Sequence, residues 1–383
     1  MTQHPDAPAI GFIGRIPVRN IWLLLLYASQ LYKELPEAAR VELEDAPDDI
    51  PELVAEILAN AVERRLRRNL SFGYERREAN LSRVRGRINV LRTERRQLLQ
   101  RGKVACIFDE LTVDTPRNRY VKAALLRLGQ VVKDTELLRR CRNLSARLER
   151  AGVSSDWDAG RNGRHPPPDV LGWMESDERR MLAAAQLAFD LAIPTEQSGH
   201  ALLAMADREA NRGWKLYEDA VAGFYDAILS HRGWRVRCQG KIEWPLDDQT
   251  AGLPDLMPSM FTDIALERRL PGVPTAARRI VIDTKFTSIV ASGWYGGESF
   301  RSGNIYQMYA YLRSQEEGGD LLWRNAAGVL LYPSLEADYN EAATIQGHEI
   351  RFATVDLAAD SRTIRRQLLR VVDPAPGRGG TGE

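Results

Sequence analysis

Residues Thr262–Phe286 read TDIALERRLPGVPTAARRIVIDTKF and combine two predicted strands with three ionisable side chains. The end of the stretch, Arg279–Phe286, is rich in β-branched apolar residues, which is typical of a buried strand. Just before it, Phe261–Leu266 predicts a second strand. The segment between them, Glu267–Arg278, contains two prolines and a glycine, so we expect a loop that joins an antiparallel pair.

The two strands carry two acids and a lysine. Because side chains alternate across a strand, Asp283 and Lys285 should share one face, and Asp263 lies on the neighbouring strand. Carboxylates on adjacent strands suit a hard divalent cation, and a nearby lysine can position water or a phosphate. The pattern therefore predicts metal-assisted phosphodiester cleavage. A simple ion pair at a strand end is the common alternative for a single Asp-x-Lys match.

Further polar residues before and after this stretch extend the pattern. Gln307 and Tyr311 lie one helical turn apart in Asn304–Leu312, and Glu218 lies on an earlier amphipathic helix. The order Glu, Asp, Asp-x-Lys, Gln-x-x-x-Tyr resembles the PD-(D/E)xK nuclease superfamily, in the branch that includes RecB-type nucleases. The resemblance implies a restriction endonuclease-like α/β domain in which Glu218 supports or occasionally binds the metal. A surface acid on the polar side of the helix is an equal alternative for Glu218.

The same resemblance implies roles for the remaining residues. Asp263 and Asp283 would hold Mg²⁺ or Mn²⁺, together with the backbone carbonyl of Thr284. Lys285 would orient water or the scissile phosphate. Gln307 would position Lys285 or a nearby phosphate. The number of metal ions stays open.

Composition indicates a globular protein with room for two domains. The chain has 383 residues, of which 44% are hydrophobic and 27% are charged. Its longest apolar run, Ile21–Ala28, is far too short to span a membrane, and the first residues lack a signal-peptide pattern. The three cysteines are scattered, with neither a disulfide framework nor metal-ligand spacing. A reducing cytoplasm is therefore the expected location.

Positive charge is concentrated in one block. Between Ala61 and Lys103, thirteen arginines and one lysine stand against four glutamates, a local charge of +10. Such a block can contact phosphates of DNA. It can equally pair with an acidic protein partner or with the acidic segment Glu42–Glu52. The sequence does not decide between these alternatives.

A second resemblance covers nearly the whole chain. Three segments are similar to the McrC subunit of modification-dependent, 5-methylcytosine restriction systems. They are IPVRNIWLLLLYA at Ile16–Ala28, VRGRIN at Val84–Asn89 and CIFDELTVDTPRNRYVKAAL at Cys106–Leu125. Later in the chain, TDI, DTK and SGNIYQMYAYL resemble the nuclease half of that family. The resemblance implies a partner, an AAA+ GTPase of McrB type that binds GTP and reads methylcytosine. It also implies methylated double-stranded DNA as the substrate.

A break near residue 160 suggests the domain organisation. Gly160–Val170 contains Gly163 and three successive prolines, a strong interruption of regular structure. We therefore predict a mixed α+β partner-binding domain over residues 1–160 and a PD-(D/E)xK domain with leading linker and helices over 161–372. A disordered tail is predicted over 373–383. Within the first domain, Glu42–Pro51 predicts an acidic turn and Val84–Leu91 a strand.

Three functions remain to be compared. The preferred interpretation is the endonuclease subunit of a restriction system, because the Asp, Asp-x-Lys and Gln set is intact. One alternative is a non-catalytic regulator that stimulates a partner NTPase. The other is a free-standing RecB-like exonuclease, although the sequence has no Gly-x-x-x-x-Gly-Lys-Ser/Thr loop that would supply a motor.

Overall fold

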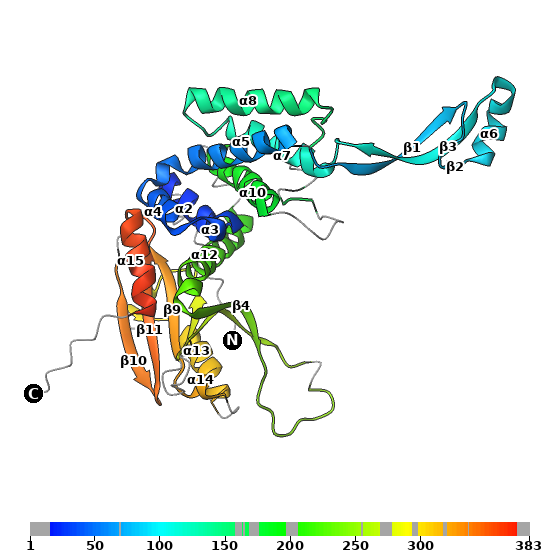
Figure 1. Cartoon of the computed structure of the whole chain (residues 1–383). Coiled ribbons are helices and arrows are strands. Elements are labelled where there is room, and N and C mark those ends of the chain that lie inside the picture. The colour runs from blue at the N-terminus through cyan, green and yellow to red at the C-terminus, as the bar shows by residue number, and fades with distance from the viewer. Residues whose placement is uncertain are drawn as a thin grey trace, which may run out of the picture. The chain divides into compact units, whose positions relative to one another are not determined.

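A computed structural model describes residues 16–68, 70–157, 163, 165–167, 176–196, 206–253, 256–268, 278–292, 298–316, 320–335 and 337–373. The chain forms two compact units (Figure 1). We call residues 1–50 and 194–383 the sheet unit, and residues 51–193 the ribbon unit. The tail predicted beyond Asp373 and most of the break predicted at 160–170 lie outside the described residues.

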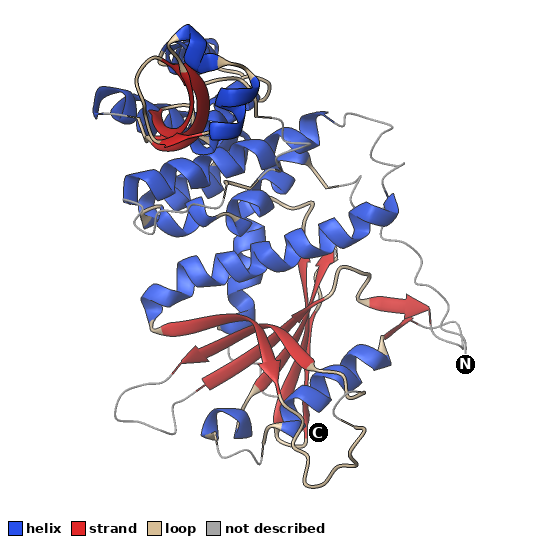
Figure 2. Ribbon diagram, turned by 90° about the vertical axis from the view of Figure 1, so that its right-hand side faces the viewer, coloured by secondary structure: helices blue, strands red, loops and turns tan. Residues whose placement is uncertain are grey.

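The sheet unit contains a six-stranded sheet with the order β10-β11-β9-β6-β5-β4. The pairs β6–β9 and β9–β11 are parallel, and the other neighbours are antiparallel. Figure 2 shows these strands in red, with helices in blue beside them. The mixed sheet with its helices confirms the predicted α/β class, and β5 and β6 form the predicted antiparallel pair. The strands are β4 (Trp234–Ile242), β5 (Met260–Arg268), β6 (Arg278–Thr284), β9 (Ala327–Ser334), β10 (Asn340–Ile345) and β11 (His348–Asp356).

Two further strands and several helices complete this unit. Strands β7 (Val290–Ser292) and β8 (Glu298–Phe300) form a separate two-stranded sheet. The helices of the sheet unit are α2 (Val18–Ala28), α3 (Gln30–Glu34), α4 (Glu37–Asp45), α12 (Ala206–Leu229), α13 (Ser302–Ser314), α14 (Leu321–Arg324) and α15 (Ser361–Val372). Short 3-10 turns occupy Pro47–Asp49 and Ser230–Arg232.

Helix α13 lies close against the sheet because β9 carries a glycine at their contact. A Cβ atom at Gly328 would come within 2.6 Å of the Met308 sulfur. Met308 is fully buried in one apolar cluster with Val281 and Leu330. Because such a cluster is densely packed, it fixes the position of the other side chains on α13.

The amino-terminal helices pack onto elements from the carboxy-terminal part of the chain. The rings of Tyr27 and Phe224 lie 5.1 Å apart, and a Cβ atom at Gly223 would overlap the backbone of Tyr27. The Asn20 amide donates to two backbone carbonyls, those of Leu357 and Ala359, both at 2.8 Å. These contacts join α2 to α12 and to the segment after β11.

This packing differs from the predicted boundary at residue 160, which assigned residues 16–50 to the amino-terminal domain. The reason is burial. Helix α2 is apolar nearly all round, and it packs more extensively against α12 than against the elements that follow it in sequence. The Glu44 carboxylate of α4 also pairs with Arg365 of α15 at 2.5 Å. The segment predicted as an acidic turn is therefore mostly helical, as α4 and the 3-10 turn after it.

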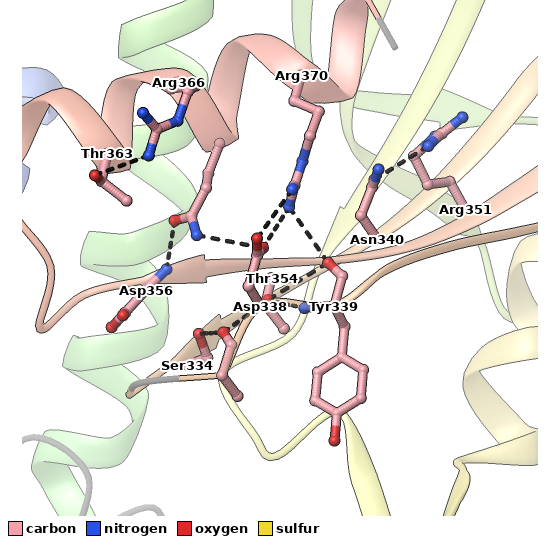
Figure 3. Close-up of polar contacts among 12 residues, drawn as sticks. Ser334, Asp338, Tyr339, Asn340, Arg351, Thr354, Asp356, Thr363, Arg366 and Arg370 are labelled. Carbon is pink, nitrogen blue, oxygen red and sulfur yellow. Dashed lines mark hydrogen bonds and ion pairs between the residues drawn. The ribbon is translucent and has the colours of Figure 1, made fainter. Parts of the chain in front are cut away.

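Polar contacts hold α15 against the end of the sheet (Figure 3). Arg370 pairs with Asp338 at 2.6 Å, and the Asp356 amide donates to Gln367 at 2.8 Å. The Thr354 hydroxyl accepts a hydrogen bond from the Tyr339 amide at 2.8 Å. The last helix is thus tied both to β11 and to the segment that leads into β10.

The ribbon unit combines four long helices with a narrow antiparallel ribbon. Its helices are α5 (Ile50–Arg68), α7 (Pro116–Leu128), α8 (Thr135–Arg150) and α10 (Ser176–Glu196), the first and last of which extend beyond its limits. Its strands have the order β1-β3-β2 and are β1 (Gly73–Leu81), β2 (Arg87–Ile88) and β3 (Val104–Thr112). The ribbon extends away from the helices of this unit and carries α6 (Val90–Arg95) near its far end (Figure 1). A short 3-10 turn, Leu98–Arg101, precedes β3.

The prediction of a strand over Val84–Leu91 is therefore wrong for most of its length. Only Arg87 and Ile88 pair with β3, and Asn89 caps α6 by accepting a hydrogen bond from the Arg92 amide at 3.1 Å. The Asn side chain satisfies a helix N–H and so favours a helix start over a continued strand.

Among the described helices, none has both the length and the apolar composition needed to cross a membrane.

Candidate active site

The two predicted acids lie opposite each other on β5 and β6. The antiparallel register pairs Ile264 with Ile282, and the next position along this register sets Asp263 across from Asp283. Asp283 is almost completely buried, with 2% of its surface exposed, and Asp263 is half-buried. The antiparallel register and the alternation of side chains thus bring both carboxylates to the same position on neighbouring strands.

Lys285 lies beside Asp283, as the alternation along β6 predicts. Its Nζ is 2.7 Å from Asp283 Oδ2 and donates to Gln307 Oε1 at 2.9 Å. Gln307 in turn donates from Nε2 to the Tyr311 hydroxyl at 2.5 Å. Because Gln307 and Tyr311 are one turn apart on α13, the helix that packs over Gly328 holds the lysine in place.

Asp263 is oriented by the residue that follows Asp283. Its Oδ2 atom accepts hydrogen bonds from the Thr284 backbone amide at 2.7 Å and from the Thr284 hydroxyl at 2.8 Å. The Thr284 carbonyl accepts a long hydrogen bond from the Trp214 indole at 3.4 Å. Thr284 therefore connects Asp263 to helix α12 and still offers a carbonyl oxygen with a second lone pair.

Glu218 is buried on α12, with 5% of its surface exposed, rather than lying on the polar side of the helix. Its Oε1 atom accepts hydrogen bonds from Lys215 at 3.4 Å and from Gln239 of β4 at 3.3 Å. Its hydrogen bonds among the described residues go to these two side chains rather than to Asp263 or Asp283. Besides burial, the negative charge of Glu218 is one cause of the raised pKa of Asp283.

Burial raises the pKa of Asp283 to about 6. Repulsion from the Asp263 and Glu218 carboxylates contributes to this raised pKa, whereas the Lys285 ammonium opposes it. A buried carboxyl with such a shift, next to a lysine and a second acid, is typical of a functional site. Near neutral pH, Asp283 is mostly ionised and its negative charge is only partly compensated.

The donor set fits a hard divalent cation. Asp283 Oδ2 is buried and lacks a hydrogen bond of good geometry, although the Lys285 ammonium lies beside it. Among the described residues, no group of three or more His, Cys, Asp or Glu side chains is placed to hold a metal. Mg²⁺ commonly binds through one or two carboxylates and keeps several waters, so Asp263, Asp283 and the Thr284 carbonyl would suffice. Glu218 lies outside this set.

Two residues at the site carry no clear signal in the sequence. Trp214 follows the apolar spacing of α12 and is expected in the core, yet 42% of its surface is exposed and its indole reaches the Thr284 carbonyl. Gln239 lies on β4 and contacts Glu218, although a glutamine on a strand predicts no role. Only the position of the neighbouring strand and helix identifies either residue.

Comparison with known proteins places the chain in a class. Residues 13–159 match the family model for a McrBC 5-methylcytosine restriction system component. A relative, the type IV methyl-directed restriction enzyme EcoKMcrBC of Escherichia coli K12, is 25% identical over 366 residues, which cover 94% of this chain and 97% of the relative. Over most of its length the chain is thus similar to a component of a methyl-directed restriction system. The match of its first part to the McrBC family model agrees with the resemblance to the McrC family.

A solved structure also matches. It is a refined half-complex from a tetradecameric assembly of Thermococcus gammatolerans McrB AAA+ hexamers with bound McrC. The TM-score is 0.41 and the sequence identity is 14%, and the match covers 93% of this chain and 76% of that chain.

Proposed function

We propose that this chain is the endonuclease subunit of a modification-dependent restriction system and cleaves DNA by metal-assisted hydrolysis. The observation that carries the proposal is the buried Asp283 in contact with Lys285 and across the register from Asp263. The order of these residues and the mixed sheet beneath them support a PD-(D/E)xK domain. The cation would be Mg²⁺ or Mn²⁺, which prefer carboxylate and carbonyl oxygens.

Each residue has a task in this proposal. Asp263, Asp283 and the Thr284 carbonyl would hold the cation, which when bound supplies a Lewis acid that activates water and offsets negative charge. Lys285 would donate hydrogen bonds to the attacking water or to a phosphate oxygen. Gln307 keeps the lysine beside Asp283 through the 2.9 Å hydrogen bond. Preorganised charges of this kind stabilise the pentacovalent transition state without rearrangement during the reaction.

We propose an AAA+ GTPase of McrB type as the partner, with GTP bound by that partner, and methylated double-stranded DNA as the substrate. The similarity to the McrBC family model and to the EcoKMcrBC enzyme supports this proposal. The ribbon unit contains most of the segment that matches the family model, so it is our candidate for the docking region. A cytoplasmic location is part of the proposal and is supported by the scattered free cysteines.

A plasmid-cleavage assay tests the nuclease assignment. The full chain, its GTPase partner, GTP and Mg²⁺ are incubated with a methylated plasmid, and nicked and linear products are quantified. We expect cleavage by the wild type, and a loss of about 100-fold or more for Asp283→Ala and Lys285→Ala. Asp338→Asn is the matched control, because this carboxylate pairs with Arg370 of α15 and should leave cleavage unchanged. Circular dichroism and partner pull-down check folding and assembly.

Wild-type cleavage by well-folded Asp283→Ala or Lys285→Ala protein would refute the assignment. A wild-type protein that stimulates GTP hydrolysis by the partner but never cuts DNA would favour the non-catalytic regulator. Cleavage from DNA ends without any partner would favour the RecB-like exonuclease.

A further inference from the structure

Gln239 has a backbone conformation that is unusual within a strand. Its φ angle is 52°, in the left-handed region that disfavours residues with a side chain. Among the described residues, the other non-glycine residues with positive φ are Gln97 and Gln346, and both lie in connections between regular elements. Gln239 instead lies in the middle of β4. Strain of this kind persists only where the surrounding structure requires it, and it is concentrated at functional sites.

The strained position lies across from the candidate metal ligands. Strand β4 pairs Cys238 with Ile264 and Gly240 with Thr262, so Gln239 lies across from Asp263. Asp263 in turn lies across from Asp283 on β6. Three polar residues therefore form one row over three adjacent strands, and the departure from regular backbone occurs at the end of this row.

The Gln239 side chain connects this row to helix α12. Its Nε2 donates to Glu218 Oε1 at 3.3 Å, and Glu218 is 5% exposed. The second donor to the same oxygen, Lys215 at 3.4 Å, is half exposed and also pairs with Asp219 at 2.9 Å. A buried carboxylate is unfavourable unless it is hydrogen-bonded. The glutamine amide is thus the donor that the strand itself contributes to Glu218.

We propose that Gln239 is a positioning residue of the nuclease site, whose strained backbone is retained because its amide fixes the Glu218 carboxylate beside the two aspartates. This inference rests on the proposed function. Glu218 lies one helical turn after Trp214, whose indole reaches the Thr284 carbonyl, so its carboxylate adds negative charge on the side of the site that faces α12. Gln239 itself touches neither the cation nor the DNA.

A glycine substitution separates this role from a structural one. Gln239→Gly removes the amide and accommodates the positive φ, so the strain disappears together with the contact. Gln346→Gly is the matched control, because its φ is 47° and its side chain accepts only a hydrogen bond from the exposed Tyr309 hydroxyl. We expect both variants to keep a melting temperature within about 3 °C of the wild type; in Gln239→Gly, relief of the strained backbone offsets the hydrogen bond that Glu218 loses. A residue with a purely structural role would instead lower it.

The same variants are then compared in the plasmid assay over a series of Mg²⁺ concentrations. Gln239→Gly should reduce cleavage about 10-fold or more and raise the Mg²⁺ concentration for half-maximal cleavage, whereas Gln346→Gly should match the wild type. Glu218→Ala should reproduce the loss, and the double variant with Gln239→Gly should add little to it, because both act through one contact.

Wild-type cleavage by Gln239→Gly would overturn this inference while leaving the nuclease assignment intact. So would a large fall in melting temperature with a proportional loss of cleavage, since that pattern indicates a structural role. Failure of the wild-type protein to cleave under any condition would instead refute the proposed function, and this inference with it.

Discussion

At the scale of single residues, the buried carboxylate of Asp283 lowers the stability of the fold when it is ionised, although the proposed function requires its charge. Burial of its carboxylate, with smaller contributions from the charges of Asp263 and Glu218, raises its pKa to about 6. The folded protein therefore binds a proton at Asp283 more tightly than the unfolded chain does. The stabilising contribution of this proton is fully present below the ordinary pKa near 4 and is lost as the pH rises through about 6.

Because the raised pKa of Asp283 lowers stability at high pH, it gives a prediction for the stability of Asp283→Asn in the absence of divalent cations. At about pH 8, replacing the buried negative charge by a neutral amide should raise the free energy of unfolding by roughly 1–3 kcal/mol. Near pH 4 the gain should disappear, because the wild-type carboxyl is then neutral as well. Urea denaturation of both proteins with EDTA at the two pH values measures the effect. A variant that is less stable than the wild type at about pH 8 would show that the Lys285 ion pair outweighs burial.

At the scale of secondary-structure elements, one buried carboxylate ties the ribbon unit together. Glu178 of α10 pairs with Arg65 of α5 at 2.8 Å, contacts Arg117 of α7, and accepts a hydrogen bond from Ser71 at 2.8 Å. Burial alone would raise the pKa of Glu178, but the Ser71 hydroxyl and the two guanidinium groups outweigh it and hold the pKa below its ordinary range. Three helices and the entry to β1 therefore depend on this carboxylate.

We expect Glu178→Ala to destabilise the protein by about 3–5 kcal/mol, because it removes a buried carboxylate that pairs with two partly buried guanidinium groups. The matched control is Asp177→Ala, whose carboxylate is half exposed and 4.0 Å from Arg64. The control should cost about 0.5 kcal/mol or less. Calorimetric unfolding of the two variants makes the comparison. Equal losses of unfolding free energy in the two variants would show that the Glu178 ion pairs do not hold the helices together.

The elements that place the site could be predicted because their sequences have strong local patterns. A β-branched run marks β6, a mostly apolar segment marks β5, and the apolar spacing around Gln307 marks α13. Strand β10 could not be predicted, since most of its residues are exposed and its composition lacks an apolar face. The positive φ of Gln239 could not be predicted either, because that conformation usually indicates glycine or asparagine.

At the scale of the whole molecule, the course of the chain differs from a simple division into two halves. Residues 1–50 belong with residues 194–383, and the ribbon unit lies between them in sequence. No local pattern in α2 specifies that α12, almost two hundred residues later, covers it. The partner-docking and cutting roles proposed for the two halves are therefore better assigned to the ribbon unit and the sheet unit.

The basic block of the ribbon unit gives a prediction at this scale. Arg65 pairs with Glu178. The other arginines of this part of α5, Arg64, Arg67 and Arg68, are exposed. We expect the triple Arg64, Arg67 and Arg68→Ala variant to lose stimulation of the partner GTPase while its DNA affinity changes little. DNA binding is measured over a salt series, because lost phosphate contacts reduce the salt dependence. A weaker salt dependence with unchanged stimulation would assign these arginines to DNA instead.

Binding of Mn²⁺ to the full chain, followed by electron paramagnetic resonance, tests the proposed metal site most directly. The wild-type protein should bind the ion near neutral pH and lose affinity below about pH 6, where Asp283 takes up a proton. The Asp263→Asn, Asp283→Asn double variant should lose this binding, whereas Lys285→Ala should keep it. Wild-type affinity in the double variant would contradict the assignment of these two carboxylates as metal ligands.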